Sequence, residues 1–133
     1  KAEGRYLKAL SLTPENPVVL NNLAWVMSER EKDLEKALEY GLKAQSISPE
    51  NPGVMDTVGV IYYKLGDYVN ASKKLEVAVK RLSKNPTIRY HYALVNIKIG
   101  EREAAIDELQ AALDSGVDFP EASEAKKLLK EIK

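Results

Sequence analysis

"NPGVMDTVGVIYYKLGDY", residues 51–68, decides the fold of this chain. Val58, Ile61 and Leu65 recur there at the spacing of one helical face, and the pattern ends at a glycine followed by an aspartate. Gly59 lies in the middle of this apolar helix, although an interior glycine costs about 1 kcal/mol relative to alanine. The missing side chain should therefore permit a close contact that offsets this cost.

The stretch is one of several similar units. Prolines recur at intervals of 35, 34 and 34 residues, at Pro17, Pro52, Pro86 and Pro120. The first three follow an asparagine, and Asn-Pro predicts a helix start because asparagine caps helices and proline fits their first turn. Each start is followed by two helical patterns with a short turn between them. We therefore predict helices at residues 2–12, 17–29, 33–47, 52–65, 68–82, 86–99, 102–115 and 120–132.

Small residues recur at three fixed places in the units, which we number from each proline as position 1. Such residues let two antiparallel helices pack at a short interaxial distance. Gly59 is therefore interpreted as a packing contact rather than as part of a ligand site. The small residues are Ala24, Gly59 and Ala93 at position 8, Ala37, Ala71 and Ala105 at position 20, and Ala44, Ala78 and Ala112 at position 27.

This pattern closely resembles the tetratricopeptide repeat (TPR) family, whose helix–turn–helix unit has a period of about 34 residues. The "YYKLGDY" turn at 62–68 is similar to the turn of that family. The resemblance implies an all-α fold, a right-handed superhelix (α-solenoid) of antiparallel helix pairs with a C-terminal capping helix. It predicts a single TPR domain over residues 1–133. Its parts are the second helix of a truncated repeat (1–16), three repeats (17–51, 52–85 and 86–119) and the capping helix (120–133).

The ends of the chain indicate a piece of a larger protein. Residues 2–16 match only the second helix of a repeat, and the chain starts at Lys1, so we expect the natural protein to continue N-terminally. "NNLAW" (21–25) and the ending "DFPEASEAKKLLKEI" (118–132) look like the C-terminal repeats of large bacterial TPR proteins. Some of those belong to exopolysaccharide or cell-envelope systems. The resemblance does not choose between bacterial cytoplasm and periplasm.

Composition excludes several kinds of chemistry. The chain has no cysteine, so disulfides, thiolate catalysis and cysteine–zinc sites are excluded. A formal net charge of zero does not favour nucleic acid or an anionic membrane as partner, and no apolar run suits a membrane span. His91 is the only histidine, and with no second histidine or cysteine to make a metal site we expect a satisfied or exposed side chain rather than a ligand or catalytic base. We predict a protein that is not an enzyme and has no metal or cofactor.

In TPR proteins the first helix of each repeat lines a concave groove, and the resemblance assigns groove positions here. Position 9 is the informative one, because it holds Trp25, Val60 and Leu94 in successive repeats. An exposed apolar row bordered by polar groups marks an interaction surface, and Trp and Tyr are typical anchors. We therefore predict a protein or peptide partner that binds through an apolar or amphipathic segment. The predicted partner-binding residues are Asn21, Trp25, Asp56, Val60, Tyr63, Tyr90, Leu94 and Lys98.

Three other interpretations stay open. The apolar row could be partly buried by the curvature of the helices, or covered by further repeats. The repeats could serve only as a structural spacer or as the capping end of a longer solenoid. Residues 2–12 lack a partner helix, and an uncovered apolar face that includes Tyr6 and Leu10 could stack on another copy of the chain.

Overall fold

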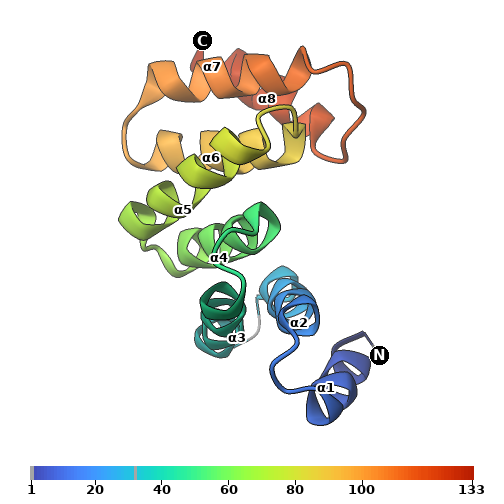
Figure 1. Cartoon of the computed structure of the whole chain (residues 1–133). Helices are drawn as coiled ribbons and strands as arrows, with labels where there is room; N and C mark the ends of the chain where they lie inside the picture. Colours follow the sequence, from blue (N-terminus) through green and yellow to red (C-terminus); the bar gives the residue numbers. More distant parts are fainter. Residues whose placement is uncertain (1, 32) are drawn as a thin grey trace.

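The computed structural model describes residues 2–31 and 33–133, which form eight α-helices and no strand. Lys1 and Lys32, which belong to the predicted units 1–16 and 17–51, lie outside the described residues. Figure 1 shows the helices stacked in chain order, with the two termini at opposite ends of the molecule. The helices are α1 (Ala2–Leu12), α2 (Pro17–Glu29), α3 (Leu34–Ile47), α4 (Pro52–Leu65), α5 (Tyr68–Arg81), α6 (Pro86–Lys98), α7 (Arg102–Leu113) and α8 (Ala122–Ile132).

The helices form three antiparallel pairs with one further helix at each end. The pairs are α2/α3, α4/α5 and α6/α7, while α1 packs on α2 and α8 packs on α7. The first helices of successive pairs contact one another, whereas their second helices make no comparable contact within the described residues. The stack therefore curves around α2, α4 and α6. This arrangement confirms the predicted TPR superhelix of antiparallel pairs with a C-terminal capping helix.

The starts of α2, α4 and α6 follow the Asn-Pro pairs, as predicted. In each, the asparagine Oδ1 accepts a hydrogen bond from a backbone N–H of the first turn. The fourth proline differs, because α8 begins at Ala122 and leaves Pro120 outside the helix. Phe119 stands where the other units have asparagine, so the side chain before this proline offers no cap acceptor. The capping asparagines are Asn16, Asn51 and Asn85.

The turns inside the pairs depend on left-handed backbone conformations. Gly66 and Gly100 have φ values of 86° and 85°, which glycine adopts without the steric cost of a Cβ. The first pair has no glycine there, and Asp33 takes up a left-handed conformation with φ 53°. Its carboxylate accepts a hydrogen bond from the Lys36 N–H, so α3 begins at Leu34, one residue later than predicted. The other predicted bounds agree to within two residues.

The small residues predicted from the repeat lie at the centre of the packing. All eight alanines at positions 8, 20 and 27 have no exposed surface. A Cβ added to Gly59 would lie 2.6 Å from Cγ of Leu75, a fully buried side chain of α5. The missing side chain of Gly59 therefore leaves the space that Leu75 fills, and the predicted packing contact is confirmed.

The exposed apolar face of α1 is not the one predicted. Tyr6 and Leu10 are half-buried and pack against core residues of the first pair, among them Leu23. They lie four residues apart and so share one face of the helix, which is the face turned towards α2. The apolar side chains that α1 exposes are Leu7 and Leu12.

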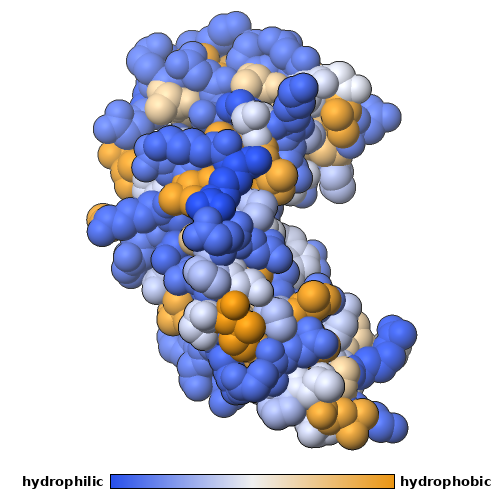
Figure 2. Space-filling view, viewed as in Figure 1, coloured by the Kyte–Doolittle hydropathy of each residue, from blue (hydrophilic) through white to orange (hydrophobic). Residues whose placement is uncertain are grey.

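The face of the molecule seen in Figure 2 is largely polar. In Figure 2 hydrophilic side chains cover most of the visible face, and apolar residues form only small separate patches. None of the helices in residues 2–31 and 33–133 is long and apolar enough to cross a bilayer.

Gly59→Ala should destabilise the chain, because its Cβ collides with a buried leucine. Overpacking a close-packed core costs about 1–3 kcal/mol, and replacing a helical glycine by alanine returns about 1 kcal/mol. We expect the free energy of unfolding to fall by up to about 2 kcal/mol, measured by urea denaturation followed by circular dichroism.

Gly4→Ala is the matched control. Gly4 is an exposed helical glycine, and nothing lies within 4 Å of a Cβ added there. This variant should be as stable as the native chain or slightly more stable. Equal stabilities of the Gly59→Ala and Gly4→Ala variants would contradict the packing role of Gly59.

Candidate functional site

A pocket of about 190 Å³ lies among the first helices of the three pairs, α2, α4 and α6. Trp25, Val60 and Leu94, which form the predicted apolar row, each contribute to its wall from a different helix. Tyr63 and Tyr90 line it as well. The structure thus brings five of the eight predicted partner-binding residues together around one space.

The apolar row is uneven in its exposure. Val60, on the middle helix, is only 6% exposed because both neighbouring first helices pack beside α4. Trp25 and Leu94, at the two ends of the row, are half-buried and keep accessible surface. The row is therefore recessed at its centre rather than open along its whole length.

Leu75 lines the pocket although it belongs to α5, a second helix. Its fully buried side chain forms the back of the pocket, because Gly59 of α4 has no side chain in its path. Sequence reasoning missed Leu75, since it considered only first helices as groove-lining. Gly59 is the sequence signal that could have predicted this contribution, because a glycine inside a helix marks a place where a side chain of the neighbouring helix packs closely.

Two charged residues stand at the edge of the pocket, Glu29 at the end of α2 and Lys64 at the end of α4. The Lys64 Nζ donates a hydrogen bond of 2.8 Å to the carbonyl oxygen of Ser28, which holds the two helix ends together. Both charged residues occupy the same repeat position as Lys98, which alone of the three is among the predicted partner-binding residues. Lys98 is exposed and lies outside the pocket.

His91 also lines the pocket, and its side chain is satisfied by a carboxylate partner. Its Nδ1 lies 2.8 Å from Oδ1 of Asp56, and the two side chains are only 10% and 14% exposed. Asp56, a predicted binding residue, does not line the pocket but fixes the imidazole that does. The two residues stand at positions 5 and 6 of successive units, so the repeat alignment places them near each other although they are 35 residues apart.

Aromatic rings surround this imidazole. The Trp25 ring lies 6.0 Å from the His91 ring, centre to centre, and the Tyr90 ring lies 6.2 Å from it. Asn21, the remaining predicted residue, does not line the pocket. Its Oδ1 is buried and has no hydrogen-bond partner within the described residues.

The tyrosines of the pocket wall are neutral at physiological pH. Burial raises the pKa of Tyr63, and the nearby phenol of Tyr68 raises this pKa further. Burial also raises the pKa of Tyr90, with the carboxylates of Glu124 and Glu121 adding to the effect. The tyrosine part of the wall is therefore uncharged and can donate hydrogen bonds through its hydroxyl groups.

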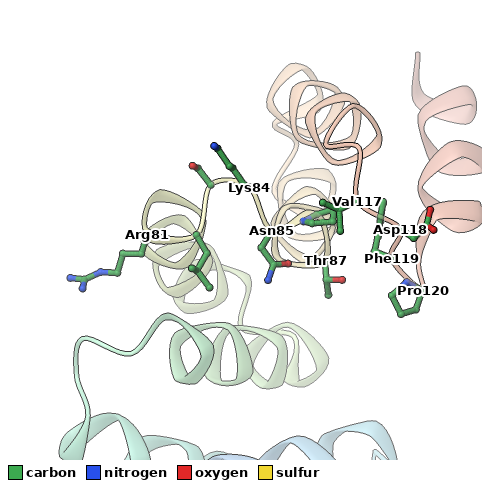
Figure 3. Close-up of a pocket in the computed structure, with 11 residues that line it drawn as sticks. Arg81, Lys84, Asn85, Thr87, Val117, Asp118, Phe119 and Pro120 are labelled. Atoms are coloured by element: carbon green, nitrogen blue, oxygen red, sulfur yellow. The ribbon is translucent and has the colours of Figure 1, made fainter.

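A larger cavity of about 610 Å³ lies away from the predicted residues, between the loops that follow α5 and α7. Figure 3 shows Val117, Phe119 and Pro120 at one end and the Arg81 side chain directed away from them at the other. The Arg81 guanidinium is bound to Glu50, so it is already neutralised. No predicted residue contributes to this cavity, and the part of the chain that the structure describes contains no cluster suited to a metal ion.

Comparison with protein families identifies the class of the chain. A family model described as anaphase-promoting complex, cyclosome, subunit 3, matches residues 30–112, and one described as tetratricopeptide repeat matches residues 6–39. Both are TPR-type models, and the first covers more than half of the chain. The chain belongs to the tetratricopeptide repeat family. No curated protein matches the sequence.

Solved structures of TPR proteins share the fold. The thermophilic TPR protein TTC0263 from Thermus thermophilus has a TM-score of 0.78 at 20% identity, over 98% of this chain and 71% of its own. YrrB, described as a TPR protein with an unusual peptide-binding site, has a TM-score of 0.79 at 22% identity, over 96% of this chain and 63% of its own. The Yersinia enterocolitica chaperone SycD, solved with a peptide of the translocator YopD, has a TM-score of 0.74 at 19% identity, over 85% of this chain and 88% of its own. At these identities the likeness establishes the fold alone.

The contact between His91 and Asp56 should couple the second and third pairs energetically. Asp56→Ala and His91→Ala should each lower the free energy of unfolding by about 1–3 kcal/mol, because each leaves a nearly buried polar group unpaired. The double variant should lose less than the sum of the two, by about 0.5–3 kcal/mol. Urea denaturation of the four proteins measures this difference. Losses that simply add would show that the pair does not connect α4 and α6.

Proposed function

We propose that this chain is a protein-interaction module whose pocket among α2, α4 and α6 binds an apolar or amphipathic segment of a partner protein. The observation that carries the proposal is the pocket itself, in which Trp25, Leu94 and Tyr63 meet from separate helices. Its volume of about 190 Å³ exceeds the ~30 Å³ that one water occupies, and is enough for a large side chain. One anchoring residue of the partner would enter it.

The chemistry of the pocket edge suits a peptide. Glu29 and Lys64 can meet polar or charged groups beside the anchoring residue, while the apolar wall accepts the anchor. The relatives support the same kind of function, because SycD was solved with a peptide of YopD and YrrB is described as having a peptide-binding site. Asn21 and Lys98 take no part in the proposed contact.

A structural spacer is the alternative, favoured by the near-complete burial of Val60 at the centre of the row. A spacer requires the stacking contacts of the repeats but makes no use of accessible Trp25 and Leu94 surface. Selection of binding peptides, followed by substitution of a pocket residue, distinguishes the two functions.

A random peptide library displayed on phage and selected on the native chain should yield peptides that share one large aliphatic or aromatic residue. Their binding should change the fluorescence of Trp25, which is the only tryptophan of the chain. Leu94→Ser should weaken binding by about tenfold or more, as expected when an interface anchor is removed. Titrations followed by tryptophan emission measure the affinities.

Val69→Ser is the control, because Val69 is 64% exposed on α5 and does not line the pocket. It makes a similar apolar-to-polar change to Leu94→Ser and should leave the affinity within about twofold. Val60 is left unchanged, since a polar residue at its buried position would disturb the fold. If the selected peptides bind both variants equally, or share no apolar residue, the pocket is not the binding site and the spacer is the better account.

A further inference from the structure

A second groove, of about 480 Å³, opens at the C-terminal end of the stack between α7 and α8. Its floor is apolar, formed by Leu113 of α7 and Leu129 of α8. The remaining lining residues are lysines, and no acidic residue lines the groove. We propose that this groove docks an acidic amphipathic α-helix of a partner protein. The lysines are Lys126, Lys127, Lys130 and Lys133.

The four lysines are available to a partner. The ion pairs found in the described residues all involve other side chains. Lys36 and Lys80 elsewhere are matched by glutamates on their own helices, whereas Glu124 and Glu131 of α8 do not line the groove. If α8 served only as a solvated cap, its lysines would not need to be gathered around the apolar floor with the glutamates kept outside it. The excess of one sign favours an occupant of the opposite sign.

The place of the groove explains why the occupant is a helix. In the preceding pairs a second helix packs on the first, α5 on α4 and α7 on α6. Position 8 faces that second helix, as the contact between Gly59 and Leu75 shows. The residue at position 8 of the last unit is Lys127, which lines the groove. The groove therefore includes the surface of α8 that corresponds to a helix-packing surface in the earlier pairs.

The same residue argues against another tightly stacked repeat. Gly59 and Ala93 permit close approach in the earlier pairs, but the long side chain of Lys127 does not. A helix docked here lies further out, with its apolar residues directed between the lysines towards Leu129. Acidic residues on both flanks of that apolar row would then meet the lysine side chains.

Two other occupants fit less well. A second copy stacked end to end would place its α1 at the groove. The exposed Arg5 and Lys8 of that helix are positively charged, as the groove is, and would be repelled. An anionic membrane would attract the lysines but would not reach the floor, because Leu129 is only 8% exposed and lies below them. An acidic helix satisfies both the charge and the recessed apolar floor.

The test uses a fluorescein-labelled synthetic peptide of about 16 residues, long enough to form a helix on binding, with leucines at i, i+4 and i+7 flanked by glutamates. Fluorescence anisotropy should detect binding to the native chain, and this binding should weaken as salt is added. The double variant Lys126→Glu/Lys130→Glu should lower the affinity by about tenfold or more. Peptides with glutamate replaced by glutamine, or leucine by serine, should also bind more weakly.

The matched control is Lys8→Glu/Lys73→Glu, which makes the same change of net charge on residues of α1 and α5, away from the groove. It should keep the affinity within about twofold. Circular dichroism verifies that both double variants are folded. The Leu94→Ser variant should bind the peptide normally, so failure of this proposal is distinguishable from failure of the proposed function.

Several outcomes would overturn the proposal. One is equal affinity of the two double variants, and another is no binding of the acidic peptide to the native chain. Binding of phosphatidylserine-containing vesicles, lost in Lys126→Glu/Lys130→Glu while the peptide does not bind, would assign the groove to a membrane surface. A mass that rises with concentration only when Lys126 and Lys130 are present would assign it to a second copy.

Discussion

The contact between Gly59 and Leu75 is the constraint on which the centre of this structure depends. Because α4 has no side chain at this point, α5 lies close enough for Leu75 to fill the gap and to form the buried back of the pocket. The same atoms therefore pack a helix pair and form part of a pocket wall. The equivalent places in the neighbouring pairs hold Ala24 and Ala93, which are fully buried and small enough to permit close helix packing.

Contacts between successive repeats give the pocket its shape. Asp56 on α4 holds His91 on α6, and Lys64 at the end of α4 is bound to the Ser28 carbonyl of α2. These hydrogen bonds join the three helices whose side chains line the pocket. A solenoid is held together only by contacts between neighbours, so such bonds fix the relative positions of residues that lie far apart in the sequence.

The repeat pattern predicted the fold almost completely, because periodic prolines, small residues and capping asparagines each determine a local structure. It failed at Pro120, where no asparagine precedes the proline and the helix starts two residues later. The pocket was predicted less well, since Leu75 and His91 reach it through tertiary contacts that no single helix pattern contains. Lys98 shares its repeat position with Lys64, yet only Lys64 lies at the pocket.

The most direct test of the proposed binding site is to map it by NMR, recording chemical-shift changes in the labelled chain as a library-selected peptide is added. The account predicts the largest changes at the Trp25 indole, the Leu94 methyl groups and the Tyr63 ring, which line the pocket from three helices. Changes concentrated in the loops at 81–87 and 117–120, with the Trp25 indole unaffected, would contradict it.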